Sequence, residues 1–321
     1  MIASDRGRRR FALFAWAVVA FNIPVILWGA FVRISFSGDG CGDHWPFCNG
    51  QVIPTHMAAP MAIEFTHRAM TGLDTLAVLA MCGWAFALFP RKHAVRRYSV
   101  LSVLFLFIEA LLGAGLVLLQ LVDNNHSSWR AVYLSAHLTN TMLLLAILTT
   151  TAWAASNGIE RIEWRRAPRL LPGALLVVIA ISITGTIAAL GDTLFPSATL
   201  ASGMARDFSS TASLLLRLRM IHPAIAVLGA AYLMYVAGWI LQRNDSGRLR
   251  ASAARVLFLT LLQVIAGMVN IALLAPLWMQ LLHLFVADVL WISVVVLTLD
   301  AAAAHVTEPV PGVGASAGVA A

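Results

Sequence analysis

Residues 278–300 read WMQLLHLFVADVLWISVVVLTLD, an apolar stretch with a histidine, His283, near its start. An α-helix needs about 20 predominantly apolar residues to cross the hydrocarbon core of a bilayer, so this stretch is long enough to span a membrane. Further windows along the chain have the same length and character. The sequence predicts eight membrane-spanning helices, at residues 11–33, 62–90, 96–122, 130–156, 168–190, 213–241, 252–275 and 278–300.

The overall composition agrees with an integral membrane protein. Of the 321 residues, 60% are hydrophobic and 12% are charged, whereas a soluble domain has roughly 45–50% apolar and about 25% charged residues. The formal net charge of +7 would suit a nucleic-acid partner if the basic residues were spread over a polar surface. We expect a lipid bilayer and no nucleic acid as the partner, because most basic residues mark the ends of spans.

Four short clusters hold most of the Lys and Arg residues, and they alternate with connections that are poor in both. This alternation is typical of loops on the cytoplasmic side of a membrane. Both termini then lie in the cytoplasm. The N-terminus has no Ser-rich and Arg-rich presequence, which favours a bacterial plasma membrane over a mitochondrial one. The clusters lie at residues 6–10, 91–97, 161–169 and 243–255.

The two halves of the chain resemble each other. Each half has four spans that enter and leave on the same side, so the repeat is parallel. We expect an all-α integral membrane protein with two pseudo-symmetric four-helix bundles, at residues 1–157 and 158–301, and a disordered cytoplasmic tail at 302–321. The matched stretches are Gly29-Ala-Phe-Val with Gly185-Thr-Ile-Ala, and Glu109-Ala-Leu-Leu-Gly113 with Gln263-Val-Ile-Ala-Gly267.

Four histidines lie near the starts of alternate spans. An imidazole at lipid depth is costly unless it is coordinated or paired. One such histidine is more often a hydrogen-bonded core residue, but four at repeating positions favour metal ligands. Two helices of one bundle can place imidazoles on opposite faces of a haem. We expect haem iron to be bound by His67 with His137 in the first bundle, and by His222 with His283 in the second.

Acidic residues accompany these histidines. Glu64 precedes His67 by three residues, so both lie on one helical face, where the carboxylate can orient the ring, move protons or favour the helix start. Arg68 can pair with a haem propionate or mark the membrane interface. Three more acids are predicted inside spans, and each is either functional or neutral and hydrogen-bonded. They are Asp74, Glu109 and Asp288.

Two of the three cysteines, Cys41 and Cys48, lie in a connection that we assign to the outer face. Cysteines on the oxidising side of a membrane can pair, so a disulfide is favoured over two free thiols. Cys82 lies inside a span, where a lone cysteine usually behaves as a small hydrophobic residue.

Three motifs together resemble the haem A synthase family: Gly29-Ala-Phe-Val-Arg33, then Cys41-Gly-Asp-His-Trp-Pro-Phe-Cys48-Asn-Gly50, then Glu64-Phe-Thr-His67-Arg68. The stretch from His283 to Trp291 extends the resemblance over nearly all eight spans. The resemblance implies an enzyme that oxidises the C8 methyl group of haem O to a formyl group, which gives haem A for terminal oxidases.

The resemblance also implies roles for single residues. His222 and His283 would hold a haem b cofactor, while His67, His137 and Arg68 would bind the substrate haem. Glu64 would be catalytic, and Cys41 and Cys48 would form a disulfide. The implied partners are molecular oxygen or water, a quinol or other electron donor, a haem O synthase and a terminal oxidase.

The chain departs from the family pattern in its second half. It lacks the second cysteine pair that many relatives carry between spans five and six, and Pro223 follows His222 where arginine is usual. Arg217 or Arg219 would then take the place of that arginine. Two other functions stay open: a di-haem b-type membrane protein that only transfers electrons, and a haem carrier or oxidase-assembly factor without catalysis.

Overall fold

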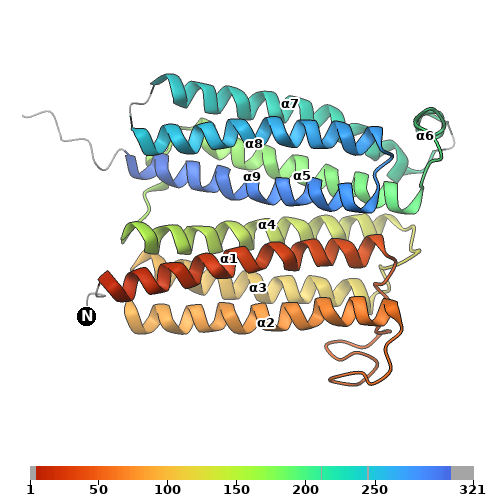
Figure 1. Ribbon diagram of the computed structural model, residues 1–321, viewed down its shortest axis with the longest axis horizontal. Helices are drawn as coiled ribbons and strands as arrows, with labels where there is room; N and C mark the ends of the chain where they lie inside the picture. Colours follow the sequence, from red (N-terminus) through yellow and green to blue (C-terminus); the bar gives the residue numbers. More distant parts are fainter. Residues whose placement is uncertain (1–4, 211, 244–245, 305–321) are drawn as a thin grey trace, which may run out of the picture.

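The computed structural model describes residues 5–210, 212–243 and 246–304, and these form a bundle of long helices (Figure 1). Eight helices in these ranges are long and apolar enough to cross a membrane, which confirms the predicted spans. A turn of 3-10 helix, η1 (Trp164–Arg166), and a short helix, α6 (Leu200–Asp207), lie between them. The long helices are α1 (Asp5–Ile34), α2 (Ala59–Leu88), α3 (Ala94–Leu118), α4 (Ser128–Asn157), α5 (Leu170–Leu194), α7 (Leu214–Arg243), α8 (Gly247–Ala272) and α9 (Leu277–Ala304).

The long helices lie in two groups of four, which is consistent with the two bundles that we expect from the sequence. Helices α1 to α4 lie together, α5, α7, α8 and α9 lie together, and α4 faces α9 across the boundary (Figure 1). Two buried indoles join α4 and α9. Trp153 Nε1 donates to Asp300 Oδ1 at 2.9 Å, and Trp291 Nε1 donates to the Met142 carbonyl at 2.8 Å. Each bond satisfies a polar group in an apolar core, so both stabilise this particular packing of the groups.

The two ends of the bundle differ in charge and in loop length. The N-terminus and the connections α2–α3, α4–α5 and α7–α8 share one end, which we call the proximal end and which carries all four basic clusters. The other end, the distal end, carries the loop at residues 35–58 and helix α6 (Figure 1). Helix α9 continues to Ala304, so the first residues of the predicted tail are helical. Residues 305–321 lie outside the described residues.

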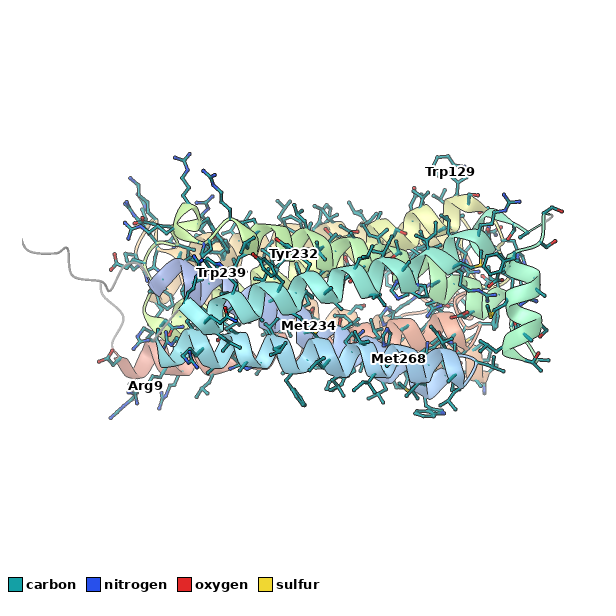
Figure 2. All side chains as sticks on the ribbon, turned by 90° about the horizontal axis from the view of Figure 1, so that it is seen from above. Arg9, Trp129, Tyr232, Met234, Trp239 and Met268 are labelled. Carbon is teal, nitrogen blue, oxygen red and sulfur yellow. A yellow bond between two sulfur atoms is a disulfide. The ribbon has the colours of Figure 1, made fainter. Side chains whose placement is uncertain are left out.

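The outer surface of the bundle is apolar, as expected where lipid is the solvent. Leu228 and Phe258 expose 72% and 64% of their surface, and Met268 exposes 59%. Arg9 and Trp129 lie near opposite ends of the molecule (Figure 2). Because water would penalise so much exposed apolar area, the long helices are stable together only inside a bilayer or a detergent micelle.

Candidate functional site

The structure brings the four predicted histidines together in two pairs, one in each bundle. His67 on α2 and His137 on α4 lie close enough for their charges to interact, and so do His222 on α7 and His283 on α9. Each pair therefore comes from two helices of the same bundle, the arrangement that two axial ligands require.

Each imidazole lies against a glycine of a neighbouring helix. A Cβ atom added at these glycines would stand 3.0 to 3.7 Å from the Cε1 atom of the ring. A larger residue would displace at least three of the four rings, so glycine is what permits the close approach. These glycines occupy matching positions in the two halves, which is consistent with an internal repeat. The pairs are Gly29 with His67, Gly113 with His137, Gly185 with His222, and Gly267 with His283.

The ring nitrogens have few partners. The Nδ1 atoms of His67, His137 and His283 are buried and make no hydrogen bond to the described residues. His222 is different, because its Nδ1 lies 3.1 Å from Thr184 Oγ1. A buried polar atom without a partner costs free energy unless a ligand satisfies it. Paired imidazoles, each held against a glycine, fit the axial ligation of haem.

A polar side chain, one helix turn before the glycine, lies beside the second histidine of each pair. On α3, Glu109 Oε1 lies 3.3 Å from His137 Nδ1 and also accepts the hydroxyl of Thr141. At the matching position on α8, Gln263 Nε2 lies 3.2 Å from His283 Nε2. The repeat thus places a carboxylate beside one histidine and an amide beside the other, so the two sites are electrostatically different.

Glu64 and Arg68 hold the loop that contains the two cysteines. Cys41 and Cys48 form the expected disulfide, with their Cα atoms 4.5 Å apart. Glu64 is 4% exposed; its Oε2 accepts from the Cys41 backbone N–H at 2.7 Å, and its Oε1 accepts from Arg68 Nη2 at 2.6 Å. The predicted catalytic carboxylate is therefore fixed between the loop and its own helix, one turn from His67.

Arg68 completes this attachment. Its Nη1 donates to the carbonyls of His44 and Phe47 at 2.7 and 2.8 Å, on the same loop. A Cβ atom on Gly40 would stand 2.5 Å from the Pro60 backbone, so glycine is needed where the loop crosses the start of α2. The loop is thus packed against α2 on both sides of His67 in the sequence, at Glu64 and at Arg68.

Arg219 has a corresponding place in the second bundle. It precedes His222 by three residues, as Glu64 precedes His67, and it carries the opposite charge. Its Nε donates to Asp207 Oδ2 at 3.1 Å, which attaches α6, and its Nη1 donates to Asp192 Oδ1 at 3.1 Å. Arg217 is exposed and donates to the Ser210 carbonyl at 2.8 Å. Arg219, one of the two expected replacements for the usual arginine, therefore holds a distal segment in place.

The other two intramembrane acids have different surroundings. Asp74 Oδ1 accepts from Asn22 Nδ2 at 2.9 Å, so this residue has a hydrogen-bond partner inside the bundle. Asp288 is 8% exposed, and its Oδ2 has no hydrogen-bond partner among the described residues.

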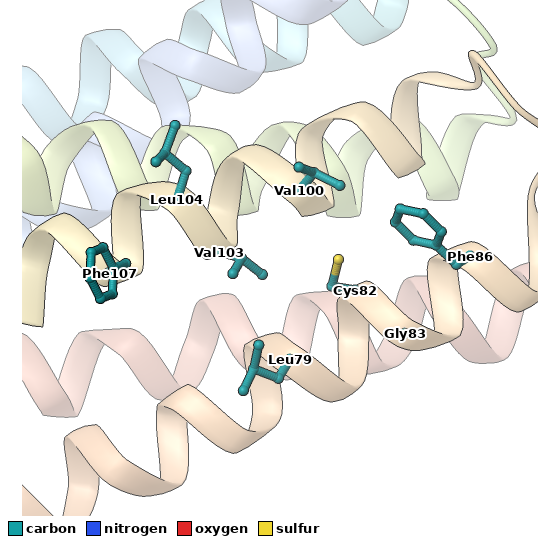
Figure 3. A pocket seen from close by; sticks show the side chains of 8 residues that line it. All are labelled: Leu79, Cys82, Gly83, Phe86, Val100, Val103, Leu104 and Phe107. Atoms are coloured by element: carbon teal, nitrogen blue, oxygen red, sulfur yellow. The ribbon is translucent and has the colours of Figure 1, made fainter.

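An apolar groove of about 560 Å³ lies between α2 and α3 (Figure 3). It contains no histidine or acid, so it is not where the histidine chemistry would occur. The groove is lined by Leu79, Cys82, Gly83, Phe86, Val100, Val103, Leu104 and Phe107.

Sequence reasoning did not identify two arginines near the site. Arg33, at the end of α1, donates to the carbonyl of Ala189 on α5, and Arg130, near the start of α4, is 2% exposed. The sequence did contain a signal that could have identified them. A few arginines lie outside the four basic clusters, in connections or at span ends that are otherwise poor in basic residues. They are Arg33, Arg68, Arg130, Arg206, Arg217 and Arg219.

The amino-acid sequence is similar to those of known proteins. A family model described as cytochrome oxidase assembly protein (COX15-CtaA) matches residues 12–295. A protein of Thermus thermophilus named Protoheme IX farnesyltransferase is 41% identical over 294 residues, which are 91% of this chain and 48% of that protein. The chain thus spans about half the length of this relative.

Proteins named Heme A synthase match over shorter stretches. The one from Exiguobacterium sibiricum is 35% identical over 115 residues, which cover 36% of this chain and 39% of that protein. The one from Geobacillus kaustophilus is 36% identical over 110 residues, which cover 34% of this chain and 35% of that protein. Because the family match extends over nearly all of the membrane spans, the chain belongs to the COX15-CtaA family of cytochrome oxidase assembly proteins.

Proposed function

We propose that this protein is a haem A synthase, which oxidises the C8 methyl group of haem O to a formyl group. The observation that carries the proposal is the presence of two imidazole pairs, one in each bundle, with each ring held against a glycine. One pair would hold a resident haem b and the other the substrate haem. A protein with a single haem function would not need both pairs.

The names of the relatives support a farnesylated haem as the substrate. The Thermus thermophilus relative is named for the transfer of a farnesyl group to protoheme, and this chain matches about half of it. Farnesylation of protohaem gives a haem with a long apolar tail. Such a molecule partitions into the bilayer, so a site between transmembrane helices can receive it from the lipid.

The two bundles would divide the work. His222 and His283 would bind haem b, and His67 and His137 would bind and orient the substrate haem. Haem iron supplies the redox chemistry that an unactivated methyl group requires. With molecular oxygen as the oxidant, one oxygen atom would enter the product, and electrons from a quinol or another donor would reduce the other atom to water. With water as the source of the oxygen atom, an electron acceptor would take up the four electrons that the methyl group loses.

The polar side chains near His67 and His137 would position the substrate and move protons. Glu109, whose Oε1 lies 3.3 Å from His137 Nδ1, would orient that ring through its charge. Glu64 would act beside His67, where its carboxylate is held by Cys41 and Arg68. The disulfide loop above Glu64 would limit the access of water to the substrate.

The cellular setting follows from the same proposal. With the basic clusters in the cytoplasm, the termini are cytoplasmic, and the distal loop and α6 face the outside of a bacterial plasma membrane. A haem O synthase would deliver the substrate and a terminal oxidase would receive the product.

The direct test is to express the chain together with a haem O synthase and to separate the extracted haems by chromatography. Haem A, or its hydroxylated intermediate, should appear with the intact chain and not with a His67→Ala, His137→Ala double variant. Folded protein that contains haem b and haem O, supplied with oxygen and reductant, but forms no oxidised haem would refute the synthase.

The second candidate function is a haem carrier or an electron-transfer protein. The contacts of Arg68 favour it in one respect, because they show an arginine attached to the loop and not free for a substrate. The pigment experiment separates the two functions, since only the synthase changes the haem.

A further inference from the structure

Arg33 is a partly buried cation that is bonded to neutral acceptors. Its Nη1 donates to the Ala189 carbonyl at 2.7 Å and to Thr193 Oγ1 at 2.9 Å, both on α5. Its Nη2 lies 3.4 Å from Gln280 Oε1 on α9. In the described residues no carboxylate lies within 4.0 Å of this guanidinium group.

Arg130 is less exposed than Arg33 and is also bonded to neutral acceptors. Its Nη1 donates to the backbone carbonyls of Asp123 and Asn125, and its buried Nε has no hydrogen-bond partner among the described residues. The Asp123 carboxylate itself accepts from the Gly38 backbone N–H at 2.9 Å. Arg130 therefore also has no carboxylate in direct contact within the described part of the chain.

The two arginines lie close enough to repel each other. Asp192 attracts Arg33, but Asp192 is already bonded to Arg219. Burying a cation is costly unless an anion accompanies it, and burying two cations side by side is more so. Two buried or partly buried arginines without a carboxylate in contact suit a site where the ligand itself supplies the anion.

Both arginines lie distal to the first histidine pair. Arg130 precedes His137 by seven residues on α4, which places it on the same helix face and about 10 Å along the axis. Arg33 follows Gly29 by four residues, one turn beyond the contact of Gly29 with the His67 ring. The carboxylates of a haem stand at one edge of the macrocycle, at a distance from the iron of roughly two helical turns.

We propose that Arg33 and Arg130 bind the propionate carboxylates of the substrate haem; this inference rests on the proposed function. Guanidinium groups bind carboxylates through charged and often bidentate hydrogen bonds. Arg68, the candidate from the sequence, already donates to Glu64 and to two loop carbonyls. The C8 methyl group shares a pyrrole ring with one propionate, so arginines that fix the propionates also fix the methyl group that is oxidised.

The test compares haem O with its dimethyl ester, in which both propionates have lost their charge. The protein is purified in detergent with its resident haem and titrated with each compound, and binding is followed by the change in the Soret absorbance. The variants are Arg33→Gln, Arg130→Gln and the double variant. Arg217→Gln is the matched control, because Arg217 is also a distal arginine bonded to a backbone carbonyl.

In the unaltered protein, esterification should weaken binding by roughly tenfold to a hundredfold, since each lost contact is a charged hydrogen bond. The double variant should bind haem O more weakly than the unaltered protein does, by the same factor. Esterification should then weaken binding to the double variant almost no further. Arg217→Gln should behave like the unaltered protein. The spectrum of the resident haem reports whether each variant is folded.

Two results would overturn the assignment. If esterification weakens binding to the double variant as much as to the unaltered protein, the arginines do not contact the propionates and serve another anion, such as a lipid headgroup. If both compounds bind equally well to all variants, the propionates are not recognised at all. Either result leaves the pigment experiment untouched, so the arginine assignment can fail while haem A is still formed.

Discussion

Glu64 Oε2 accepts a hydrogen bond of 2.7 Å from the backbone N–H of Cys41, the first cysteine of the loop disulfide. The same carboxylate is paired with Arg68 on the next turn of α2. One buried acid thus connects the disulfide-bonded loop to the helix that carries His67. Substitutions at Glu64 should therefore affect loop attachment and chemistry together, and variants that separate the two effects are informative.

We expect Glu64→Gln to retain the resident haem and to lose most haem A formation, because the amide can still accept from Cys41 but is neither a base nor a counter-ion. Glu64→Ala should in addition lower the unfolding temperature, since a buried ion pair that loses one partner costs about 3–5 kcal/mol. Chromatography of the haems and thermal unfolding measure the two effects. Normal haem A formation by Glu64→Gln would remove this carboxylate from proton transfer.

The glycine contacts give a prediction with internal controls. Gly29→Ala should weaken binding of the substrate haem, because the new Cβ would stand 3.0 Å from the His67 ring, and such overpacking costs about 1–3 kcal/mol. Gly185→Ala should in the same way weaken retention of the resident haem at His222.

The matched controls are Gly72→Ala on α2 and Gly238→Ala on α7, where an added Cβ meets open space. These variants should bind haem normally and gain helix stability of up to about 1 kcal/mol. Soret titration and the ratio of haem to protein after purification measure the outcome. Equal behaviour of Gly29→Ala and Gly72→Ala would mean that the glycine contact has no role in haem binding.

Removal of the loop disulfide should destabilise the protein moderately. The bridge closes a short loop, with a sequence separation of 7 between its cysteines, for which chain entropy gives about 2–3 kcal/mol. A Cys41→Ser, Cys48→Ser variant should unfold at lower temperature and form less haem A. Cys82→Ser, a change in the α2–α3 groove, serves as the control and should alter neither. An unchanged activity of the double variant would show that Glu64 and Arg68 hold the loop without help.

The start of α3 should make stability depend on pH. His93 caps the helix with its Nδ1, which accepts from the Val95 N–H at 3.1 Å. Burial lowers the pKa of His93 below its usual value of 6.5, against the attraction of Glu160. In the unfolded chain the His93 ring binds a proton more readily than in the folded protein. The contribution of His93 to the free energy of unfolding is therefore fully present above about pH 6.5 and is lost progressively as the pH falls below it.

Thermal unfolding between pH 7.5 and pH 5 checks this expectation. His93→Asn can still cap the helix but does not titrate, so it should remove this part of the pH dependence. If the variant and the unaltered protein lose stability in parallel as the pH falls, other groups are responsible.

The parts of the fold that depend on repeated spacing could be predicted from the sequence. The apolar windows predicted the eight long helices, and the basic clusters predicted which helix ends lie on the same side of the bundle. The spacing of the four histidines predicted the pairs His67 with His137 and His222 with His283. Each of these sequence signals recurs along the chain, so the prediction of the fold does not depend on any single weak occurrence.

The contacts between segments distant in the sequence could not be predicted. Nothing in the spacing of residues says that Arg68 bonds to the carbonyls of His44 and Phe47, or that Arg219 joins Asp192 to Asp207. Arg68 was expected to pair with a haem propionate or to mark the interface, and Arg219 was one of two candidates, with Arg217, to replace a propionate-pairing arginine. The sequence gives the charge of a side chain but not the acceptors that folding brings to it. Helix α6 was not predicted because its eight residues carry no apolar span.

The bonds of Trp153 to Asp300 and of Trp291 to Met142 have a consequence for electron movement. They lie between α4 and α9, and each of these helices carries one histidine of a different pair. Electron tunnelling slows exponentially with distance, so two redox groups exchange electrons at a constant rate only if their separation is constant. A junction held by buried indole hydrogen bonds keeps the two helices in register, so groups held by His137 and His283 would stay at one tunnelling distance.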